Sequence, residues 1–393
     1  MGTRVRFLAA LLVSVSLLGL SECTTSSSSK TTSSTGALFV TTQGDSLVSG
    51  FTIDLSTGKL STGAAGVATG SIPSAMILAP SGNALFVTNG AANSISAYTV
   101  KSDGTLSAAS GTQATGTTPV GMAMDAAGHF LFVANQGQQI DPASSTISVF
   151  SIQDTALTPA PGSPFPTAAP LAPSGTGPAA VAVTPDGKFL FVANQFDNTV
   201  TEFSVNASGV LTRLLSIPVG TAPSALAITP DGGLLYVANS GSSTVSAFAV
   251  CNQIVTNCSI PTSPDGSLTP VSNSPFSVGL DPVSIAVTPD GKLLYVVNRR
   301  SNQISEFKVG TATGVLTPNT QPTISTGGDP VWATVRLGAT AVSTTGGTTD
   351  YLYVANLGTS SISVYSFDST VGVLSQVGSP VSTGGQPSSM AAK

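Results

Sequence analysis

The sequence predicts an all-β protein, a seven-bladed β-propeller with four antiparallel strands in each blade. Three observations lead to this prediction. A pentapeptide of apolar and β-branched residues recurs seven times, strand-like segments flank each copy, and no stretch has the period of an amphipathic helix. The shorter spacings between copies match the roughly 40–45 residues of a propeller blade. The copies begin at Leu38, Leu85, Leu131, Leu190, Leu235, Leu294 and Leu352.

Each repeat is expected to supply four strands in a fixed order. A proline opens the first strand, as in Pro178–Val183, and a tight turn such as Pro185-Asp186-Gly187 ends it. Proline fixes φ, aspartate bonds the turn backbone, and glycine accepts a positive φ. The pentapeptide is the second strand, and its β-branched and aromatic residues suit burial on both faces. The third strand alternates small polar with apolar residues, as in Ser94–Tyr98, and a Gly-x-Leu motif opens the fourth, as in Gly104–Leu106.

The two ends of the repeat region predict how the ring closes. The first repeat begins at Leu38 with no first strand before it, whereas Gly385–Ala392 look like a first strand with no pentapeptide after them. One such sheet cannot cover both of its apolar faces, so neighbouring sheets must stack. We therefore expect the propeller to occupy residues 36–393, with its C-terminal strand completing the first blade and leaving no open edge there.

The first 35 residues are expected to direct and tether the protein. Arg4 and Arg6 precede an apolar run that ends at Leu20, which predicts a secretory signal peptide over residues 1–22. Cys23 follows as in a bacterial lipoprotein signal, which predicts its lipidation; Glu22 departs from that pattern, and ordinary signal-peptide cleavage is the alternative. Residues 23–35 are mostly serine and threonine and are expected to form a flexible tether. These features predict an exported protein held on the cell envelope, on its periplasmic or extracellular face.

The two remaining cysteines, Cys251 and Cys258, lie in one expected loop. In the oxidising environment of an exported protein they can form a disulfide. A metal site is the alternative, but no histidine or further cysteine lies nearby in the sequence to complete a tetrahedral shell. We expect the disulfide.

Composition excludes several classes of function. The chain has 13 basic and 18 acidic residues, a net charge of −5 and only 8% charged residues, which argues against a protein that binds nucleic acid by neutralising phosphates. A single histidine excludes mechanisms that need several imidazoles. The aspartates of the Asp-Gly turns come singly, unlike the dense carboxylates of a calcium loop. We expect neither a metal nor another cofactor.

The repeats resemble a known group of proteins. Tyr236–Asn239, Tyr295–Asn298 and Tyr353–Asn356, each after an apolar strand and a turn, are similar to YVTN-type β-propeller repeats. That group includes the seven-bladed lactonase family, which resembles 6-phosphogluconolactonase. The resemblance implies the fold strongly, but it implies a particular reaction only weakly because propellers host many functions.

Strand order divides the connections between two rims. Turns between first and second strands and between third and fourth strands lie on one rim, named here the turn rim. Loops after the pentapeptides and crossovers between blades lie on the opposite rim, the crossover rim, where we expect ligands. One charged cluster is predicted there, and its members are Asp281, Arg299, Arg300, Asp329, Trp332 and Arg336. Arginine can clamp an anion and tryptophan offers a flat face to a sugar, whereas the alternative is a set of solvated surface pairs.

Two other features are expected to be structural. Six pentapeptides end in asparagine, and we expect these side chains to cap their own loops rather than to form a ligand-binding ring. His129 lies in an expected turn at a position where another repeat has Lys188, so we expect it on the turn rim in solvent. No Gly-x-Ser-x-Gly elbow is present.

These observations predict a non-catalytic binding or scaffold module at the cell envelope. The alternative is a lactonase-like hydrolase that acts on a sugar lactone. Expected partners are a small anionic ligand or an envelope protein, with the membrane reached through the lipid on Cys23 and with no nucleic acid.

Overall fold

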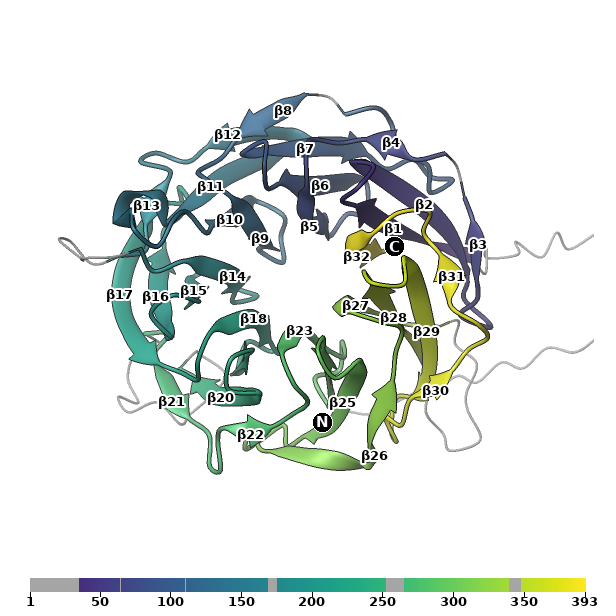
Figure 1. Ribbon diagram of the computed structural model, residues 1–393. Helices are drawn as coiled ribbons and strands as arrows, with labels where there is room; N and C mark the ends of the chain where they lie inside the picture. Colours follow the sequence, from purple (N-terminus) through teal and green to yellow (C-terminus); the bar gives the residue numbers. More distant parts are fainter. Residues whose placement is uncertain (1–34, 64, 110, 169–174, 252–264, 339–347) are drawn as a thin grey trace, which may run out of the picture. The chain divides into compact units, whose positions relative to one another are not determined.

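The described residues form a ring of seven antiparallel sheets, as the computed structural model in Figure 1 shows. The description covers residues 35–393 except 64, 110, 169–174, 252–264 and 339–347. We number the sheets as blades 1 to 7 in the order of their pentapeptides. The predicted signal peptide, Cys23 and nearly all of the predicted tether lie outside the described residues, and none of the described segments is a helix able to span a bilayer.

The first strand of each repeat lies innermost in the ring, as predicted. These strands are β5 (Pro73–Leu78), β9 (Pro119–Met124), β14 (Pro178–Val183), β18 (Pro223–Ile228), β23 (Pro282–Val287), β27 (Pro330–Arg336) and β32 (Pro387–Ala392). Each contacts the innermost strand of both neighbouring blades, so the ring is closed.

The pentapeptides form the second strands and are almost wholly buried. They lie in β1 (Thr35–Thr42), β6 (Ala84–Asn89), β10 (Phe130–Asn135), β15 (Phe189–Asn194), β19 (Leu234–Asn239), β24 (Leu293–Asn298) and β28 (Thr349–Asn356). The third strands are β2 (Leu47–Asp54), β7 (Ser94–Thr99), β11 (Thr146–Gln153), β16 (Thr199–Val205), β20 (Thr244–Val250), β25 (Gln303–Val309) and β29 (Ser361–Asp368).

The outermost strands are the least regular. Blades 4 and 6 have one long outermost strand, blades 1, 3, 5 and 7 have two short pieces in this place, and blade 2 has one short strand. They are β3 (Leu60–Thr62), β4 (Val67–Ala68), β8 (Thr112–Ala114), β12 (Ala156–Pro159), β13 (Phe165–Pro166), β17 (Leu211–Pro218), β21 (Leu268–Pro270), β22 (Phe276–Ser277), β26 (Leu316–Ser325), β30 (Ser375–Gln376) and β31 (Val381–Ser382). One short 3₁₀ helix, η1 (Pro142–Ser144), lies in the loop after β10.

The C-terminal strand completes blade 1, as predicted. β32 pairs antiparallel with β1, and Ala37 and Lys393 exchange backbone hydrogen bonds of 3.1 and 2.7 Å. The buried hydroxyl of Thr41 lies 2.8 Å from the hydroxyls of both Ser388 and Ser389. Closure therefore rests on backbone and side-chain hydrogen bonds between the two ends of the repeat region.

Apolar side chains fill the spaces between blades. Seven clusters are found among the described residues, and each joins two neighbouring blades. Tyrosines add polar contacts: Tyr236 donates to the carbonyl of Gly314 at 3.0 Å, and Tyr295 donates to that of Gly372 at 2.8 Å. A tyrosine in the pentapeptide thus bonds to the Gly-x-Leu motif of the next blade.

The Asp-Gly turns form as their sequence predicts. In blade 4, Thr184 Oγ1 donates to Asp186 Oδ1 at 2.6 Å, the Lys188 amide donates to the same oxygen at 3.2 Å, and Gly187 takes a φ of +71°. That φ is strained for a residue with a side chain, which explains the glycine. The aspartates are therefore engaged within their own turns.

Candidate functional site

In blades 6 and 7 an aspartate precedes the proline that opens the innermost strand. Asp281 and Asp329 have φ values of 58° and 54°, a left-handed conformation that aspartate tolerates better than most residues. Their carbonyls accept the amides of Arg299 and Leu357, each at 2.9 Å. These bonds fold the loop after each pentapeptide onto the crossover, which places both carboxylates on the crossover rim.

Arg299 bridges these two aspartates. Its Nη2 and Nε each lie 2.9 Å from Oδ2 of Asp281, and its Nε lies 3.8 Å from Oδ1 of Asp329. The side chain of Asp281 is only 15% exposed, whereas those of Arg299 and Asp329 are 46% and 47% exposed. Asp281 therefore fixes the guanidinium, while Asp329 remains accessible from solvent.

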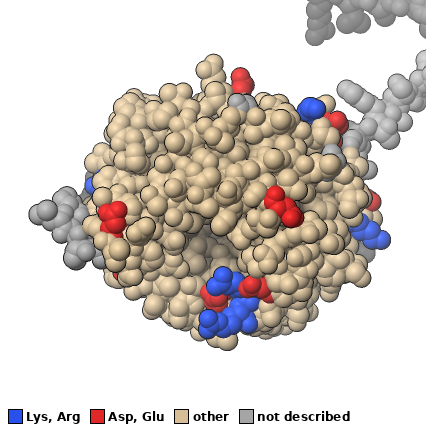
Figure 2. Space-filling model, turned by 45° about the horizontal axis from the view of Figure 1, so that its top comes forward, with Lys and Arg blue, Asp and Glu red and all other residues tan. Residues whose placement is uncertain are grey.

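The sector of blade 6 differs in charge from the rest of its face. Figure 2 shows basic and acidic side chains gathered beside a hollow at the centre of an otherwise mostly uncharged face, in the lower part of that view. Arg300 is exposed, its amide donates to the carbonyl of Leu280 at 3.2 Å, and no ion pair engages its guanidinium among the described residues. An exposed guanidinium beside an arginine–aspartate pair can receive an anionic or carbonyl oxygen.

Trp332 lies on the same rim as this cluster, whereas Arg336 does not. Trp332 lies near the crossover end of β27, opposite Ala355, and packs against the apolar cluster between blades 7 and 1. Arg336 is the last residue of the same strand, opposite Tyr351. Six residues of a β-strand span about 20 Å, so Arg336 lies toward the turn rim. The prediction that it converges with Arg299 is wrong, because the innermost strand runs from one rim to the other.

The asparagines that end the pentapeptides are structural, but not in the way expected. Asn135 Nδ2 donates to the hydroxyls of Thr146 and Ser148 at 3.1 and 2.9 Å, and Asn239 Nδ2 donates to those of Thr244 and Ser246 at 3.2 and 3.0 Å. In these two blades the partners are side chains of the third strand, whereas Asn298 Nδ2 also donates to the carbonyls of Val296 and Gln303, each at 3.2 Å, and Asn89 Oδ1 accepts the amide of Gly70 at 2.9 Å. Each asparagine therefore ties two strands of its own blade together, and it is wholly buried.

The sequence did not predict a role for one pair of residues, Gln136 and Gln195. Gln136 and Gln195 follow the terminal asparagines of blades 3 and 4, and Gln136 Nε2 donates to Gln195 Oε1 at 2.7 Å. Both side chains are half-buried and lie on the crossover rim. The signal for them in the sequence was their shared position after the pentapeptide, where Arg299 stands in blade 6.

The single histidine lies on the turn rim, as predicted. His129 is 73% exposed, in the turn between β9 and β10, with its Nδ1 3.5 Å from Oδ2 of Asp125. It is therefore on the opposite rim from Arg299.

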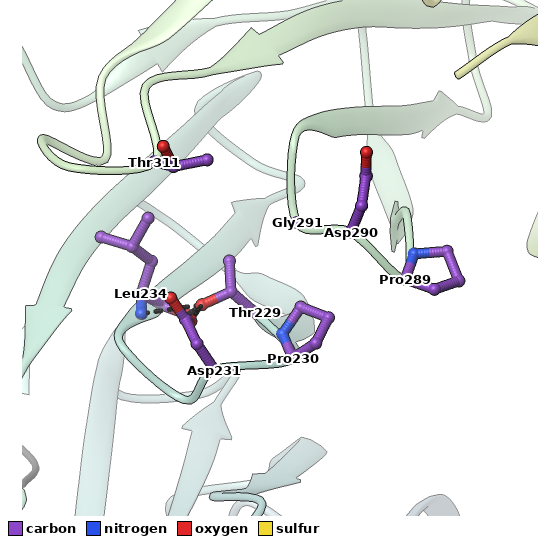
Figure 3. Close-up of a pocket in the computed structure, with 8 residues that line it drawn as sticks. All are labelled: Thr229, Pro230, Asp231, Leu234, Pro289, Asp290, Gly291 and Thr311. Carbon is purple, nitrogen blue, oxygen red and sulfur yellow. Dashed lines mark hydrogen bonds between the residues drawn. The ribbon is translucent and has the colours of Figure 1, made fainter. Parts of the chain in front are cut away.

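The turn rim also has a pocket, shown in Figure 3, with a cavity volume of about 320 Å³. The Asp-Gly turns of blades 5 and 6 line it, together with Leu234 and Thr311. Its carboxylates serve their own turns, since Thr229 Oγ1 donates to Asp231 at 2.5 Å and Lys292 Nζ lies 3.3 Å from Asp290. Nothing in its lining belongs to the predicted cluster.

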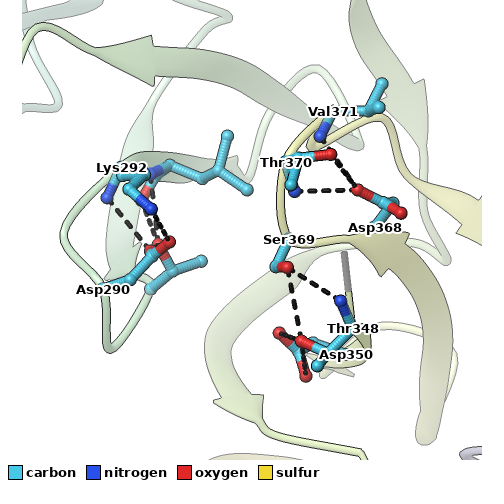
Figure 4. Close-up of polar contacts among 10 residues, drawn as sticks. Asp290, Lys292, Thr348, Asp350, Asp368, Ser369, Thr370 and Val371 are labelled. Carbon is cyan, nitrogen blue, oxygen red and sulfur yellow. Dashed lines mark hydrogen bonds and ion pairs between the residues drawn. The ribbon is translucent and has the colours of Figure 1, made fainter. Parts of the chain in front are cut away.

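Neighbouring carboxylates of blade 7 are engaged in the same way (Figure 4). Asp368 Oδ1 accepts the amide of Thr370 at 2.8 Å. Asp350 Oδ1 accepts the amide of Gly338 at 3.1 Å, and burial raises the pKa of this carboxyl. Among the described residues no group of three or more histidine, cysteine, aspartate or glutamate side chains is arranged to hold a metal ion.

Two carboxyls are buried between blades. Glu306 of β25 is 0% exposed and Glu202 of β16 is 4% exposed, at equivalent positions of blades 6 and 4. Burial raises the pKa of each to about 7, and the nearby Asp265 adds to the rise for Glu202. Glu306 Oε2 accepts the amide of Leu374 of blade 7 at 3.1 Å, while Oε1 is buried without a hydrogen bond in the described structure.

The predicted disulfide stays a prediction. Cys251 is buried directly after β20, and Cys258 lies outside the described residues.

Comparison with known proteins decides the family. The family model described as "Lactonase, 7-bladed beta-propeller" matches residues 57–156, 140–255 and 262–335, well over half of the chain. The chain belongs to the seven-bladed β-propeller lactonase family. The resemblance inferred from the YVTN-type repeats is thereby confirmed.

Solved structures resemble this lactonase-family propeller over nearly its whole length. A putative 6-phosphogluconolactonase from Bacteroides fragilis has a TM-score of 0.71 at 24% identity, over 92% of this chain and 99% of the other. The periplasmic gluconolactonase PpgL of Pseudomonas aeruginosa has a TM-score of 0.72 at 22% identity, over 91% and 99% of the two chains. At these identities the likeness shows the fold alone. A search of the curated proteins found no match to this lactonase-family chain.

Proposed function

We propose that this propeller hydrolyses a sugar lactone at the crossover rim, where Asp281, Arg299, Arg300 and Asp329 form the reactive cluster. The observation that carries the proposal is the ion-paired Arg299 beside an exposed Arg300 and a half-exposed Asp329. Membership of the lactonase family supports it, as do structural neighbours described as a putative 6-phosphogluconolactonase and a periplasmic gluconolactonase. This places the lactonase alternative ahead of the non-catalytic module that the sequence favoured.

The chemistry needs a base for water and a cation for the developing charge. Asp329 takes a proton from water as the water oxygen bonds to the lactone carbonyl carbon, and the carbonyl oxygen becomes an oxyanion. The guanidinium groups of Arg299 and Arg300 stabilise that oxyanion. The ring carbon–oxygen bond then breaks, the proton passes from Asp329 to the leaving ring oxygen, and a hydroxy acid forms. Asp281 orients Arg299 without touching substrate.

Replacement of Asp329 and Arg299 tests the proposal. Loss of a general base typically costs about 10²–10⁴-fold in rate, and loss of an oxyanion donor about 10²–10³-fold. We therefore expect Asp329→Asn and Arg299→Ala to lose kcat by these factors in a pH-stat assay with glucono-δ-lactone, corrected for spontaneous hydrolysis. His129→Ala on the opposite rim is the matched control. Equal kcat in all four proteins, or no hydrolysis by the unaltered protein, contradicts the proposal.

A non-catalytic binding module is the second candidate. The observation that favours it is the separation of His129, the only imidazole of the chain, from the arginine cluster. If the protein is a binding module, the arginine cluster binds a small anionic ligand, or a group on an envelope protein, and does not hydrolyse it. Calorimetric titration with gluconate separates the two: binding that Arg299→Ala abolishes, in a protein with no lactone hydrolysis, favours the module.

We also infer that the protein is exported and lipid-anchored. Arg4, Arg6, the apolar run to Leu20 and the position of Cys23 support this inference. Metabolic labelling with a fatty acid tests it, because Cys23→Ala should abolish labelling and release the protein from membranes. Labelling that survives the substitution contradicts lipidation at this residue.

A further inference from the structure

The glutamine pair occupies the same structural position as Arg299. The amide of Gln136 donates to the carbonyl of Thr118 at 2.9 Å, and that of Gln195 to Gly177 at 2.8 Å, just as Arg299 donates to Asp281 at 2.9 Å. Each acceptor directly precedes the proline that opens an innermost strand. Because the blades are related by rotation about the ring, these three side chains lie at equivalent places around the same rim, with the glutamines two and three blades from Arg299.

The pair has hydrogen-bonding capacity left over. The bond of 2.7 Å between the two amides uses one N–H group and one carbonyl oxygen. Whichever amide donates, one carbonyl oxygen and one NH₂ group remain. Neither of these has a partner elsewhere in the described part of the chain. A fixed acceptor and donor side by side match two neighbouring hydroxyl groups of a ligand.

An aromatic residue, Phe196, directly follows Gln195 in the chain. The ring of Phe196, the residue after Gln195, lies against the α-carbon of Gly177, where an added Cβ would approach the ring carbon Cδ2 to 2.4 Å. Gly177 is therefore required for this placement of the ring, and it also has a positive φ of +62°. Phe196 remains half-buried. Apolar ring faces combined with a few fixed polar groups are typical of small-ligand sites.

Blade 1 also has a glutamine at the corresponding position, because Gln43 follows its pentapeptide and its amide donates to the carbonyl of Gln386 at 2.9 Å, but no hydrogen bond joins its side chain to that of a neighbouring blade among the described residues. Gly90, Ser240 and Leu357 follow the terminal asparagines of blades 2, 5 and 7. None of them brings a side-chain amide, and none is bonded to the equivalent residue of the next blade in the described structure. Blades 3 and 4 are therefore distinguished by the hydrogen bond between their glutamine side chains, rather than by the presence of glutamine alone.

We propose that Gln136, Gln195 and Phe196 form a subsite that binds the hydroxyl groups and the apolar face of a sugar ring, opposite the arginine cluster on the same rim. The proposal rests on the proposed lactone hydrolysis and adds the residues that distinguish a hydroxylated lactone from a plain one. The amides bind vicinal hydroxyls, Phe196 packs on the ring carbons, and the lactone carbonyl then faces Arg299 and Arg300.

Two lactones that differ only in their substituents test this subsite. Glucono-δ-lactone carries hydroxyl groups on its ring, whereas δ-valerolactone has the same ring without them. The variant Gln136→Met/Gln195→Met keeps side-chain length and removes the amides. We expect it to lose about 10-fold in kcat/KM for glucono-δ-lactone, the effect of one or two neutral hydrogen bonds, mostly through a higher KM. Hydrolysis of δ-valerolactone should be unchanged.

The controls separate the subsite from folding and from the proposed function. Gln139→Met, in the same loop and exposed, should leave both lactones unaffected. Phe196→Leu should also weaken only glucono-δ-lactone, which tests the subsite independently of the amides. Equal losses with both lactones, or no loss with either, overturn the subsite while leaving lactone hydrolysis intact. Absence of hydrolysis of either lactone by the unaltered protein instead overturns the proposed function, and the subsite with it.

Discussion

The buried carboxyl of Glu306 predicts a pH dependence of stability that one substitution should remove. This side chain is 0% exposed, its Oε2 accepts the amide of Leu374, and its Oε1 has no hydrogen bond in the described structure. The side chain is inaccessible to solvent and no cationic side chain among the described residues pairs with it, so ionisation is unfavourable in the folded state. Glu306→Gln keeps the shape and the acceptor for Leu374 but cannot ionise.

The size of this change in stability follows from the pKa of Glu306. Burial raises the pKa of Glu306 from 4.5 to about 7. Between these two values the folded protein keeps a proton that the unfolded chain has lost, so stability falls as pH rises through this window. At about 1.36 kcal/mol per pH unit, the full loss is about 3 kcal/mol. Above pH 7 both states are ionised and the loss is constant.

Urea unfolding followed by the fluorescence of Trp332 measures the effect between pH 4.5 and pH 8.5. We expect Glu306→Gln and the unaltered protein to have equal midpoints at the acid end, with the variant more stable by about 3 kcal/mol at the alkaline end. Glu202→Gln, at the equivalent position of blade 4, should behave alike, and the exposed Asp154→Asn is the matched control. A constant difference between Glu306→Gln and the unaltered protein across this range refutes the reasoning.

Three further predictions concern the fold and the turn rim. Tyr295→Phe should lower the free energy of unfolding by about 1–3 kcal/mol, because the buried carbonyl of Gly372 loses its donor; urea unfolding measures it, and an unchanged midpoint contradicts it. Removal of residues 387–393 should lower the melting temperature markedly, since β1 loses its partner strand; calorimetry tests this, and an unaltered melting temperature would show that the ring does not need closure. His129→Ala should leave melting temperature and lactone hydrolysis unchanged, because the side chain is exposed on the turn rim; a loss of kcat would place catalysis on that rim.

Much of the fold could be predicted because its determinants are local. The Asp-Gly turn is formed by residues close together in the sequence, such as Thr184, Asp186 and Gly187. The local sequence therefore predicts the geometry of the turn directly. The alternation of the third strands and the buried pentapeptides likewise reflect faces set by neighbouring residues. The closing strand was predictable because each end of the repeat region lacks what the other supplies.

The candidate site was only partly predictable because side chains meet there across crossovers. Asp281 and Arg299 were expected together since the loops of one blade share a rim, and they form an ion pair. Arg336 was misplaced because it ends a strand that runs from the crossover rim to the turn rim, about 20 Å from Pro330, where the strand begins. Gln136 and Gln195 are 59 residues apart, and their shared position after the pentapeptide places both on the crossover rim but does not indicate that their side chains meet.

The sequence by itself determined seven repeats, their strands and turns, and the ring that closes with the C-terminal strand, because period and turn chemistry act between near neighbours in the chain. Only the tertiary structure decided which side chains of different blades meet: the glutamines of blades 3 and 4, Tyr295 with Gly372, and Glu306 with Leu374. Those contacts depend on how the packed apolar faces set each blade against the next, and no local pattern records that arrangement.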